Sequence, residues 1–183
     1  MSSLDGLQTR PIAAFWLATG VFTTTMAGMT DTLLSAIDAR RPDLIGLAQD
    51  LIRIPTLNPP GLNYRQICDY LAARFLAQGW TCQMIRATGA PGDSDSHPRW
   101  NLIARIDSGR PGDCVHFNSH HDVVEVGHGW TRDPFGGELD GDRLYGRGAC
   151  DMKGGIAAMC VAAARAAQMD QFIEHLPDGY KTQ

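Results

Sequence analysis

The sequence has no excess of positive charge and no basic stripe. Its 16 lysines and arginines are outnumbered by 20 aspartates and glutamates, which gives a formal net charge of −4. Proteins that bind nucleic acid carry basic patches against the phosphates, so we expect no nucleic-acid partner. The chain also lacks a Gly-Lys dipeptide, which excludes a phosphate-binding loop of the Gly-x-x-x-x-Gly-Lys type. It contains no internal repeat of roughly 20 to 50 residues, so a solenoid is excluded as well.

Paired cysteines are also lacking. Five cysteines stand singly, without a Cys-x-x-Cys pair, in segments whose patterns favour helix or buried strand. Free cysteine commonly acts as a small buried hydrophobic residue, and disulfides are rare in the cytosol. We therefore expect reduced thiols and a cytoplasmic protein. The five are Cys68, Cys82, Cys114, Cys150 and Cys160.

The sequence has one uncharged run of the length that a membrane span requires. Residues Pro11–Thr30 follow a single basic residue, Arg10, and are diluted by threonines and glycines. The hydrophobic segments of signal peptides and membrane helices are more apolar than this run. We expect no membrane association. The alternative is a membrane-anchored form, which requires that this run be translated. Met29 is an alternative start, so residues 1–28 are interpreted as an apolar N-terminal extension.

The next part of the chain has helical patterns. With 44% hydrophobic residues, the chain can bury one core. Pro42 and Asp43 suit the first turn of a helix with an apolar stripe. Asn63 and Gln66 resemble a capping box for a second helix, which Gly79 is placed to end. The stripes consist of Leu44, Ile45, Leu47, Ala48, Leu51 and Ile52 in the first helix and Ile67, Leu71 and Phe75 in the second.

Strand-like runs follow the helices. They cover Trp80–Arg86, Trp100–Ile106 and Asp113–Ser119, and the third suits a strand covered on both faces. Asp140-Gly141 within Glu138–Leu144 predicts a tight hairpin. A final helix is expected from just after Asp151 to about Met169. This is an α/β pattern, with a mixed or parallel sheet flanked by helices.

A histidine and two aspartates have the layout of a metal site. His120 and Asp122 form a His-x-Asp triplet where the third strand would end, and Asp151 lies at a helix start. In open α/β sheets, ligands gather at the carboxyl ends of strands. A ligating histidine needs an acceptor on its second ring nitrogen, which Asp122 can supply. Taken singly, these residues would be a loop histidine, a turn former and a helix N-cap, but nearby glycines let the backbone approach Asp151 closely. These glycines are Gly146, Gly148, Gly154 and Gly155.

Three motifs carry a resemblance to a known family. They are Ser-His-His-Asp-Val-Val at 119–124, Gly-Trp-Thr-Arg-Asp-Pro-Phe-Gly-Gly at 129–137 and Tyr-Gly-Arg-Gly-Ala-Cys-Asp-Met-Lys-Gly-Gly at 145–155. Together they closely resemble the dinuclear-zinc metallopeptidases that include acetylornithine deacetylase, succinyl-diaminopimelate desuccinylase, aminoacylase and glutamate carboxypeptidase. The likeness extends more loosely over residues 29–165, and it implies the N-terminal part of a zinc-peptidase-like catalytic domain.

The resemblance implies an activity and a role for each site residue. His120 would bind one zinc, Asp151 would bridge two zinc ions, and Asp122 would position the imidazole of His120. Cobalt could substitute for zinc. The implied reaction is hydrolysis of the amide of a small N-acyl amino acid by a metal-activated water. Members of the family form homodimers through an inserted dimerisation domain.

The sequence departs from the family beyond about Arg165. The Glu-Glu pair that would supply the general base and another ligand is absent, as are the later ligands and the dimerisation domain. Glu174 and His175 are the only nearby substitutes. The chain is therefore expected to be truncated and inactive as it stands. The alternative is a non-enzymatic remnant, or pseudo-enzyme fragment, that binds metal weakly or not at all.

The tail, residues 166–183, is atypical for this family. Its Phe-Ile-x-x-Leu-Pro-x-Gly-Tyr pattern is similar to a helical segment of ATP-binding-cassette transporter ATPase domains. A chance amphipathic helix is the alternative interpretation.

The remaining polar and aromatic residues of interest receive plain structural interpretations. His97 and His128 are expected in loops and His116 in a strand. Trp130 and Phe135 are expected to anchor the loop over the site. Arg132 and Arg147 could form ion pairs within that loop or meet a substrate carboxylate.

Overall fold

The computed structural model describes residues 34–107, 109, 111 and 114–173. The chain divides into two compact units, one up to Arg40 and one from Arg41 onward. The architecture below is that of the second unit. Pro11–Thr30, the tail from residue 174 and Asp113 lie outside the described residues, so the division into 1–28, 29–165 and 166–183 stays a prediction.

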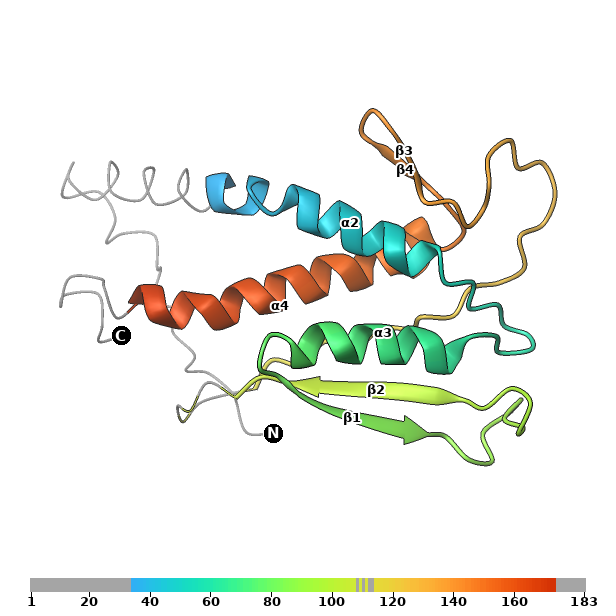
Figure 1. Cartoon of the computed structure of the whole chain (residues 1–183), viewed down its shortest axis with the longest axis horizontal. Coiled ribbons are helices and arrows are strands. Elements are labelled where there is room, and N and C mark those ends of the chain that lie inside the picture. The colour runs from blue at the N-terminus through green and yellow to red at the C-terminus, as the bar shows by residue number, and fades with distance from the viewer. Residues whose placement is uncertain (1–33, 108, 110, 112–113, 174–183) are drawn as a thin grey trace, which may run out of the picture. The chain divides into compact units, whose positions relative to one another are not determined.

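Three helices and two strand pairs make up the second unit (Figure 1). The helices are α2 (Arg41–Ile52), α3 (Tyr64–Leu76) and α4 (Gly154–Ile173). The strands are β1 (Thr81–Arg86), β2 (Trp100–Arg105), β3 (Glu138–Asp140) and β4 (Arg143–Tyr145). A short turn, η2 (Ala149–Lys153), precedes α4. Among the described residues, no helix combines the length and apolar character needed to cross a bilayer.

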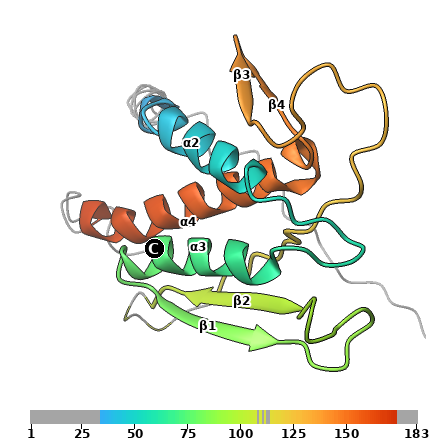
Figure 2. The same ribbon diagram turned by 45° about the vertical axis from the view of Figure 1, so that its right-hand side comes forward.

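The elements of this unit form layers. Helix α3 lies between the β1–β2 pair and the α2–α4 pair, as the two views in Figures 1 and 2 both show. β2 alternates half-buried and exposed residues, as expected for a strand with one face on a helix and one toward water. Trp100, Leu102 and Ala104 are on the covered face.

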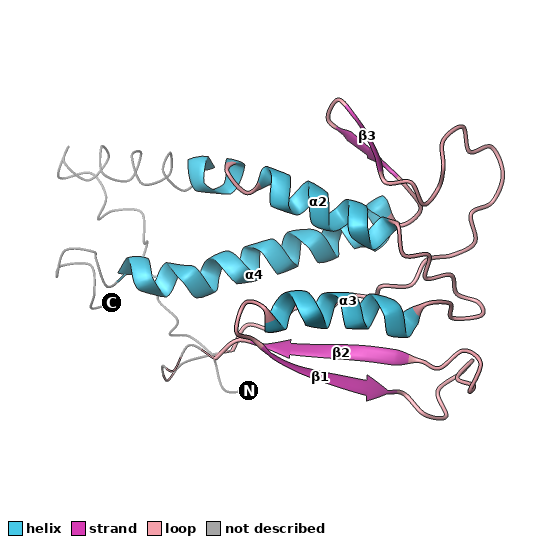
Figure 3. Cartoon of the chain, viewed as in Figure 1, coloured by secondary structure: helices cyan, strands magenta, loops and turns pink. Residues whose placement is uncertain are grey.

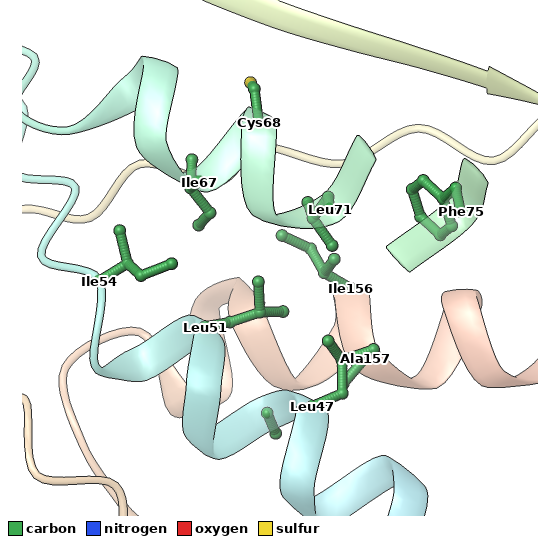
Figure 4. Close-up of a cluster of buried hydrophobic side chains, with 10 residues drawn as sticks. Leu47, Leu51, Ile54, Ile67, Cys68, Leu71, Phe75, Ile156 and Ala157 are labelled. Carbon is green, nitrogen blue, oxygen red and sulfur yellow. The ribbon is translucent and has the colours of Figure 1, made fainter. Parts of the chain in front are cut away.

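The core lies between the three helices (Figure 4). Leu51 of α2, Ile67 of α3 and Ala157 of α4 are completely buried, and Ile156 of α4 is 3% exposed. Each large aliphatic side chain buried in this way contributes about 1.5–3 kcal/mol to folding. The predicted apolar stripe of α2 is therefore confirmed by its fully buried members, which are Leu47, Ala48, Leu51 and Ile52.

The end of α3 follows the expected glycine stop. Gly79 has φ +80, and its N–H donates to the carbonyl of Leu76, while the N–H of Trp80 donates to the carbonyl of Phe75. This pair of hydrogen bonds, with a hydrophobic contact across it, defines a Schellman motif. The rings of Phe75 and Trp80 supply the contact, stacked 4.6 Å apart.

The start of α3 differs from the prediction. Asn63 has a left-handed backbone with φ 56 and makes no side-chain cap, so the capping box with Gln66 is wrong. A capping side chain needs an extended backbone at that position. Asn63 Nδ2 instead donates to Pro55 O at 2.7 Å, which ties the loop to the end of α2.

The strands confirm the predicted elements in part. β1 and β2 match two of the three predicted runs, and β3 and β4 form the predicted hairpin around Gly141. The two central residues of the turn are Gly141 and Asp142, since Asp140 pairs with Arg143. Of these two, Gly141 alone has a positive φ, +58, which is the pattern of a type II′ turn. Both strand pairs are antiparallel (Figure 3), and within the described ranges a parallel sheet is not found.

The third predicted strand is wrong over residues 114–119. These residues are all exposed and belong to no strand. A strand requires a neighbour to pair its backbone N–H and C=O groups, and the described strands pair only with one another, β1 with β2 and β3 with β4. The prediction depended on the apolar side chains of this run. In the structure these side chains are exposed instead of buried: Val115 is 77% and Phe117 50% exposed.

Candidate functional site

His120 lies between two carboxylates that are far apart in sequence. Its Nδ1 is 3.1 Å from Asp122 Oδ1, and its Nε2 is 2.9 Å from Asp151 Oδ1, 31 residues away. Burial alone would lower the pKa of His120, but the hydrogen bond to Asp151 and the nearby carboxylates outweigh it, so the pKa is raised. The structure therefore brings together all three residues that the sequence singled out for metal chemistry.

Asp122 is held from its other side by two polar side chains. Asn58 Nδ2 donates to Asp122 Oδ2 at 2.7 Å, and Tyr64 also hydrogen-bonds the carboxylate. Burial of Asp122 would raise its pKa, but these two hydrogen bonds and the charge of His120 outweigh it, so the pKa is lowered. Asp122 thus stays an acceptor on both of its oxygens.

Backbone pairing places Asp122 and its neighbours beside the loop that follows α2. Leu57 and Val123 form a parallel bridge. Val123 N donates to Thr56 O at 2.9 Å, and Asn58 N donates to Val123 O at 2.8 Å. The Thr56 hydroxyl donates to His121 O. This short ladder fixes the backbone on which His120 and Asp122 stand.

Asp151 projects from the turn before α4. Its backbone is extended, with φ −127 and ψ 98, its peptide bond to Met152 is cis, and its side chain is 85% exposed. The expected close approach of backbone around it is present. A Cβ at Gly148 would collide with Val123, and one at Gly154 would collide with the carbonyl of Ala149. A larger residue at either glycine would force the backbone around Asp151 or its neighbours to shift.

A pocket of about 240 Å³ opens over these side chains. The cluster contributes the imidazole and both carboxylates, and Arg147 and Cys150 lie at its wall. A pocket of this kind combines apolar walls with a few convergent polar groups, as ligand sites do. Its lining consists of His120, Asp122, Val123, Val124, Gly146, Arg147, Gly148, Cys150 and Asp151.

The donor atoms of His120 and Asp151 fit a shared cation. Two ligand atoms of a tetrahedral zinc, at bond lengths of 2.0–2.2 Å, stand roughly 3.3–3.6 Å apart. His120 Nε2 and Asp151 Oδ1 are 2.9 Å apart, so a small outward shift of the exposed Asp151 side chain would admit a shared ion. Asp122 on Nδ1 is the acceptor that a ligating imidazole requires. Within the part of the chain that the structure describes, no group of three or more His, Cys, Asp or Glu residues converges on one point.

The arginines and aromatic residues near the site make contacts within the loop around it and with the neighbouring hairpin. Arg132 pairs with Glu138 at 2.6 Å and with Asp140 at 2.7 Å, so it forms ion pairs, and its partners lie in strand β3 and not in the loop itself. Arg147 Nη2 donates to Val126 O at 2.7 Å, as does Trp130 Nε1. Arg147 also lies over the Trp130 ring. The predicted anchoring of this loop by Trp130 therefore agrees with its contacts.

Other histidines lie away from the cluster. His116 and His128 are exposed, and His97 contacts Ser96 in the loop after β1. His121 faces the interior, where Nε2 is 3.1 Å from Trp100 O and the ring meets Tyr64 edge-on at 4.7 Å. Burial lowers the pKa of His121.

Several residues around the site were missed in the sequence. Asn58 and Tyr64 hold Asp122, and Lys153 is completely buried with Nζ donating to Ile54 O at 2.7 Å. Burial lowers the pKa of Lys153 to about 8. Polar residues in a Pro-rich loop and at a helix start carry no periodic signal, and their partner Asp122 is 64 residues from Asn58 and almost as far from Tyr64. The signal in the sequence was the Asn-Pro-Pro-Gly loop at 58–61, which contains Asn58 but does not indicate its contact with Asp122.

Comparison with known proteins identifies the family. Residues 116–173 match the model of peptidase family M20/M25/M40. A succinyl-diaminopimelate desuccinylase of Gluconobacter oxydans is 40% identical over 126 residues, which is 67% of this chain and 30% of the relative. Those of Rhodospirillum centenum and Methylobacterium radiotolerans are 42% identical over 123 residues and 41% over 136, covering 66% and 73% of this chain.

The chain spans 30–32% of the length of these three relatives. The resemblance carried by the three sequence motifs is confirmed, and this chain is similar to part of the proteins of peptidase family M20/M25/M40.

Proposed function

We propose that this chain supplies part of the metal site of a zinc-dependent amide hydrolase. The observation that carries the proposal is the position of His120, with Asp122 on one ring nitrogen and Asp151 on the other. An imidazole oriented by one carboxylate and facing another has the chemistry of a metal ligand. The family and the desuccinylase relatives support the same reaction class.

In this proposal each residue of the cluster has one role. His120 Nε2 and Asp151 would hold zinc or cobalt, and the second oxygen of Asp151 would be available to a second ion. Asp122 holds the proton on His120 Nδ1, so that Nε2 presents its lone pair. A bound zinc would lower the pKa of water to about 7 and polarise the acyl carbonyl. Val123 and Val124 form the apolar part of the pocket wall.

The proposed substrate is a small N-acyl amino acid. The names of the relatives specify N-succinyl-diaminopimelate, so we propose a succinylated or similarly acylated amino acid. Arg147 is the cationic residue in the pocket wall. We propose a cytoplasmic setting, which fits the five free thiols.

The experiment that tests the proposal is zinc binding by the 183-residue chain. Zinc retained after dialysis is measured for the wild type, His120→Ala and Asp151→Asn, with His128→Ala as the matched exposed-histidine control. We expect zinc to be retained by the wild type and His128→Ala and lost from the other two. Equal zinc in His120→Ala and the wild type contradicts the proposed site.

The same preparations test activity. The described residues offer two metal ligands, and the sequence has no Glu-Glu pair, so we propose that the 183-residue polypeptide by itself turns over N-succinyl-diaminopimelate too slowly to detect. Turnover that a chelator abolishes would contradict this. If the wild type retains no zinc at all, the alternative of a non-enzymatic remnant is favoured.

A further inference from the structure

A line of hydrogen bonds runs outward from His120 to a cation on another loop. His120 Nδ1 meets Asp122 Oδ1 at 3.1 Å, Asp122 Oδ2 accepts from Asn58 Nδ2 at 2.7 Å, and Asn58 Oδ1 accepts from Arg99 Nη2 at 3.1 Å. Asp122 and Asn58 are partly buried. The line joins the site to the residue immediately before β2.

The two neighbours of Asn58 determine which way its amide points. Arg99 can only donate a hydrogen bond, and an ionised Asp122 can only accept one. The amide oxygen must therefore face Arg99 and the amide nitrogen must face Asp122. A flipped amide would set oxygen against carboxylate and N–H against guanidinium, and would lose both hydrogen bonds.

Arg99 is itself confined. Its guanidinium lies 5.0 Å over the Tyr64 ring, and its backbone N–H donates to Asp93 Oδ1 at 3.0 Å. Gly61 and Gly92 pass so close to the guanidinium that a Cβ at either position would collide with it. A confined donor fixes its acceptor in turn, because neither side chain is free to swing toward water.

We propose that Asn58, oriented by Arg99, is a positioning residue that holds the Asp122 carboxylate against His120. This inference rests on the proposed function, since the orientation of His120 matters only if its Nε2 binds a metal ion. Without the Asn58 N–H, the Asp122 carboxylate can rotate about χ2 and leave Nδ1 with only the neutral backbone carbonyl of Asp122, 3.2 Å away. Loss of partners that orient a ligating histidine weakens metal binding by about 10–100-fold, and we expect about 10-fold here because Asn58 acts through Asp122.

The test compares zinc affinity among matched variants of the 183-residue chain, by competition with a chromophoric chelator. Asn58→Asp keeps the shape and removes the donor, and Asn58→Ala removes both polar atoms. Asn63→Ala is the control, because Asn63 lies in the same loop and its Nδ2 makes a hydrogen bond of the same 2.7 Å length, but to Pro55 O. We expect about 10-fold weaker zinc binding for both Asn58 variants and less than 2-fold change for Asn63→Ala.

Two further readouts separate positioning from a general loss of structure. In wild-type NMR spectra, the side-chain amide resonances of Asn58 should shift on zinc addition while those of Asn63 stay in place. In an Asp122→Asn background, Asn58→Ala should cause no further loss of affinity, because its partner has already been changed. Additive losses would indicate a structural role and overturn the inference.

The outcomes distinguish this inference from the proposed function. Zinc binding that depends on His120 but not on Asn58 overturns the inference and leaves the metal site standing. A wild-type chain that binds no zinc overturns both.

Discussion

At the scale of single residues, burial rather than residue type separates the roles of like side chains. His120 is half exposed between two carboxylates, whereas the adjacent His121 is directed at Trp100 O and Tyr64. Cys150 is exposed at the pocket, whereas Cys160 is half-buried beside the core. One histidine and one cysteine therefore lie at the pocket, and another of each lies in or beside the interior.

The Cys160 thiol gives a prediction about pH. Burial raises its pKa from 9.0 to about 11, so between these values the unfolded chain loses a proton that the folded chain keeps. The free energy of unfolding should therefore fall as pH rises above 9. We expect this thiol to contribute a loss of about 1 kcal/mol between pH 8 and pH 10.

Urea unfolding at both pH values measures this contribution. The wild type is compared with Cys160→Ala, which lacks the thiol, and Cys114→Ala serves as the exposed control. Cys160→Ala should lose less stability than the wild type on going to pH 10, and Cys114→Ala should follow the wild type. Identical pH profiles for all three proteins would refute the prediction.

At the scale of elements, α2 and the turn before α4 use glycine for opposite reasons. Gly46 lies within α2, where a Cβ would meet no atom within 4 Å. Gly148 has φ +84, and a Cβ there would collide with Val123. The first glycine is a local weakness of its helix, and the second is required by the close approach of two segments.

Replacing each glycine by alanine should therefore change stability in opposite directions. Gly46→Ala should raise the free energy of unfolding by about 0.5–1 kcal/mol, since alanine loses less backbone entropy in a helix. Gly148→Ala should lower it by about 3 kcal/mol, because a strained backbone and a collision act together. Denaturant unfolding measures both values, and a neutral Gly148→Ala would show that the turn can move freely.

At the scale of the whole molecule, one described segment between β2 and the site is exposed and belongs to no helix or strand. Residues 114–120 lead from the region after β2 to His120 and are exposed throughout. Within the described residues, the apolar side chains of Val115 and Phe117 are only partly covered, being 77% and 50% exposed. A segment without packing or backbone pairing opens easily to proteases.

Limited proteolysis with chymotrypsin should detect this difference. Phe117 is 50% exposed, and Phe75 in α3 is 7% exposed. In the 183-residue chain, cleavage after Phe117 should precede cleavage after Phe75, and Phe117→Ala should remove the early fragment. Mass spectrometry of the fragments identifies each site, and early cleavage after Phe75 would contradict the packing described above.

The helices and hairpins could be predicted because their signals are local. The apolar spacing in α2, the glycine after α3 and the Asp-Gly turn act within a few residues. The capping box failed because Asn63 is drawn to Pro55 O, a contact that spacing alone does not reveal. The strand over residues 114–119 failed because a strand exists only with a neighbour, and apolar composition does not supply one.

The sequence by itself was enough to predict a reaction class, through the family resemblance that its motifs carry, and to single out His120, Asp122 and Asp151. These residues lie within a few positions of recognisable motifs, and imidazole and carboxylate are donor types that bind metal ions. Only the tertiary structure decided how the cluster is held. Asn58 reaches Asp122 across 64 residues, and Arg99 reaches Asn58 across 41. Contacts of such separation depend on how the helices and hairpins pack, not on any local preference of the chain.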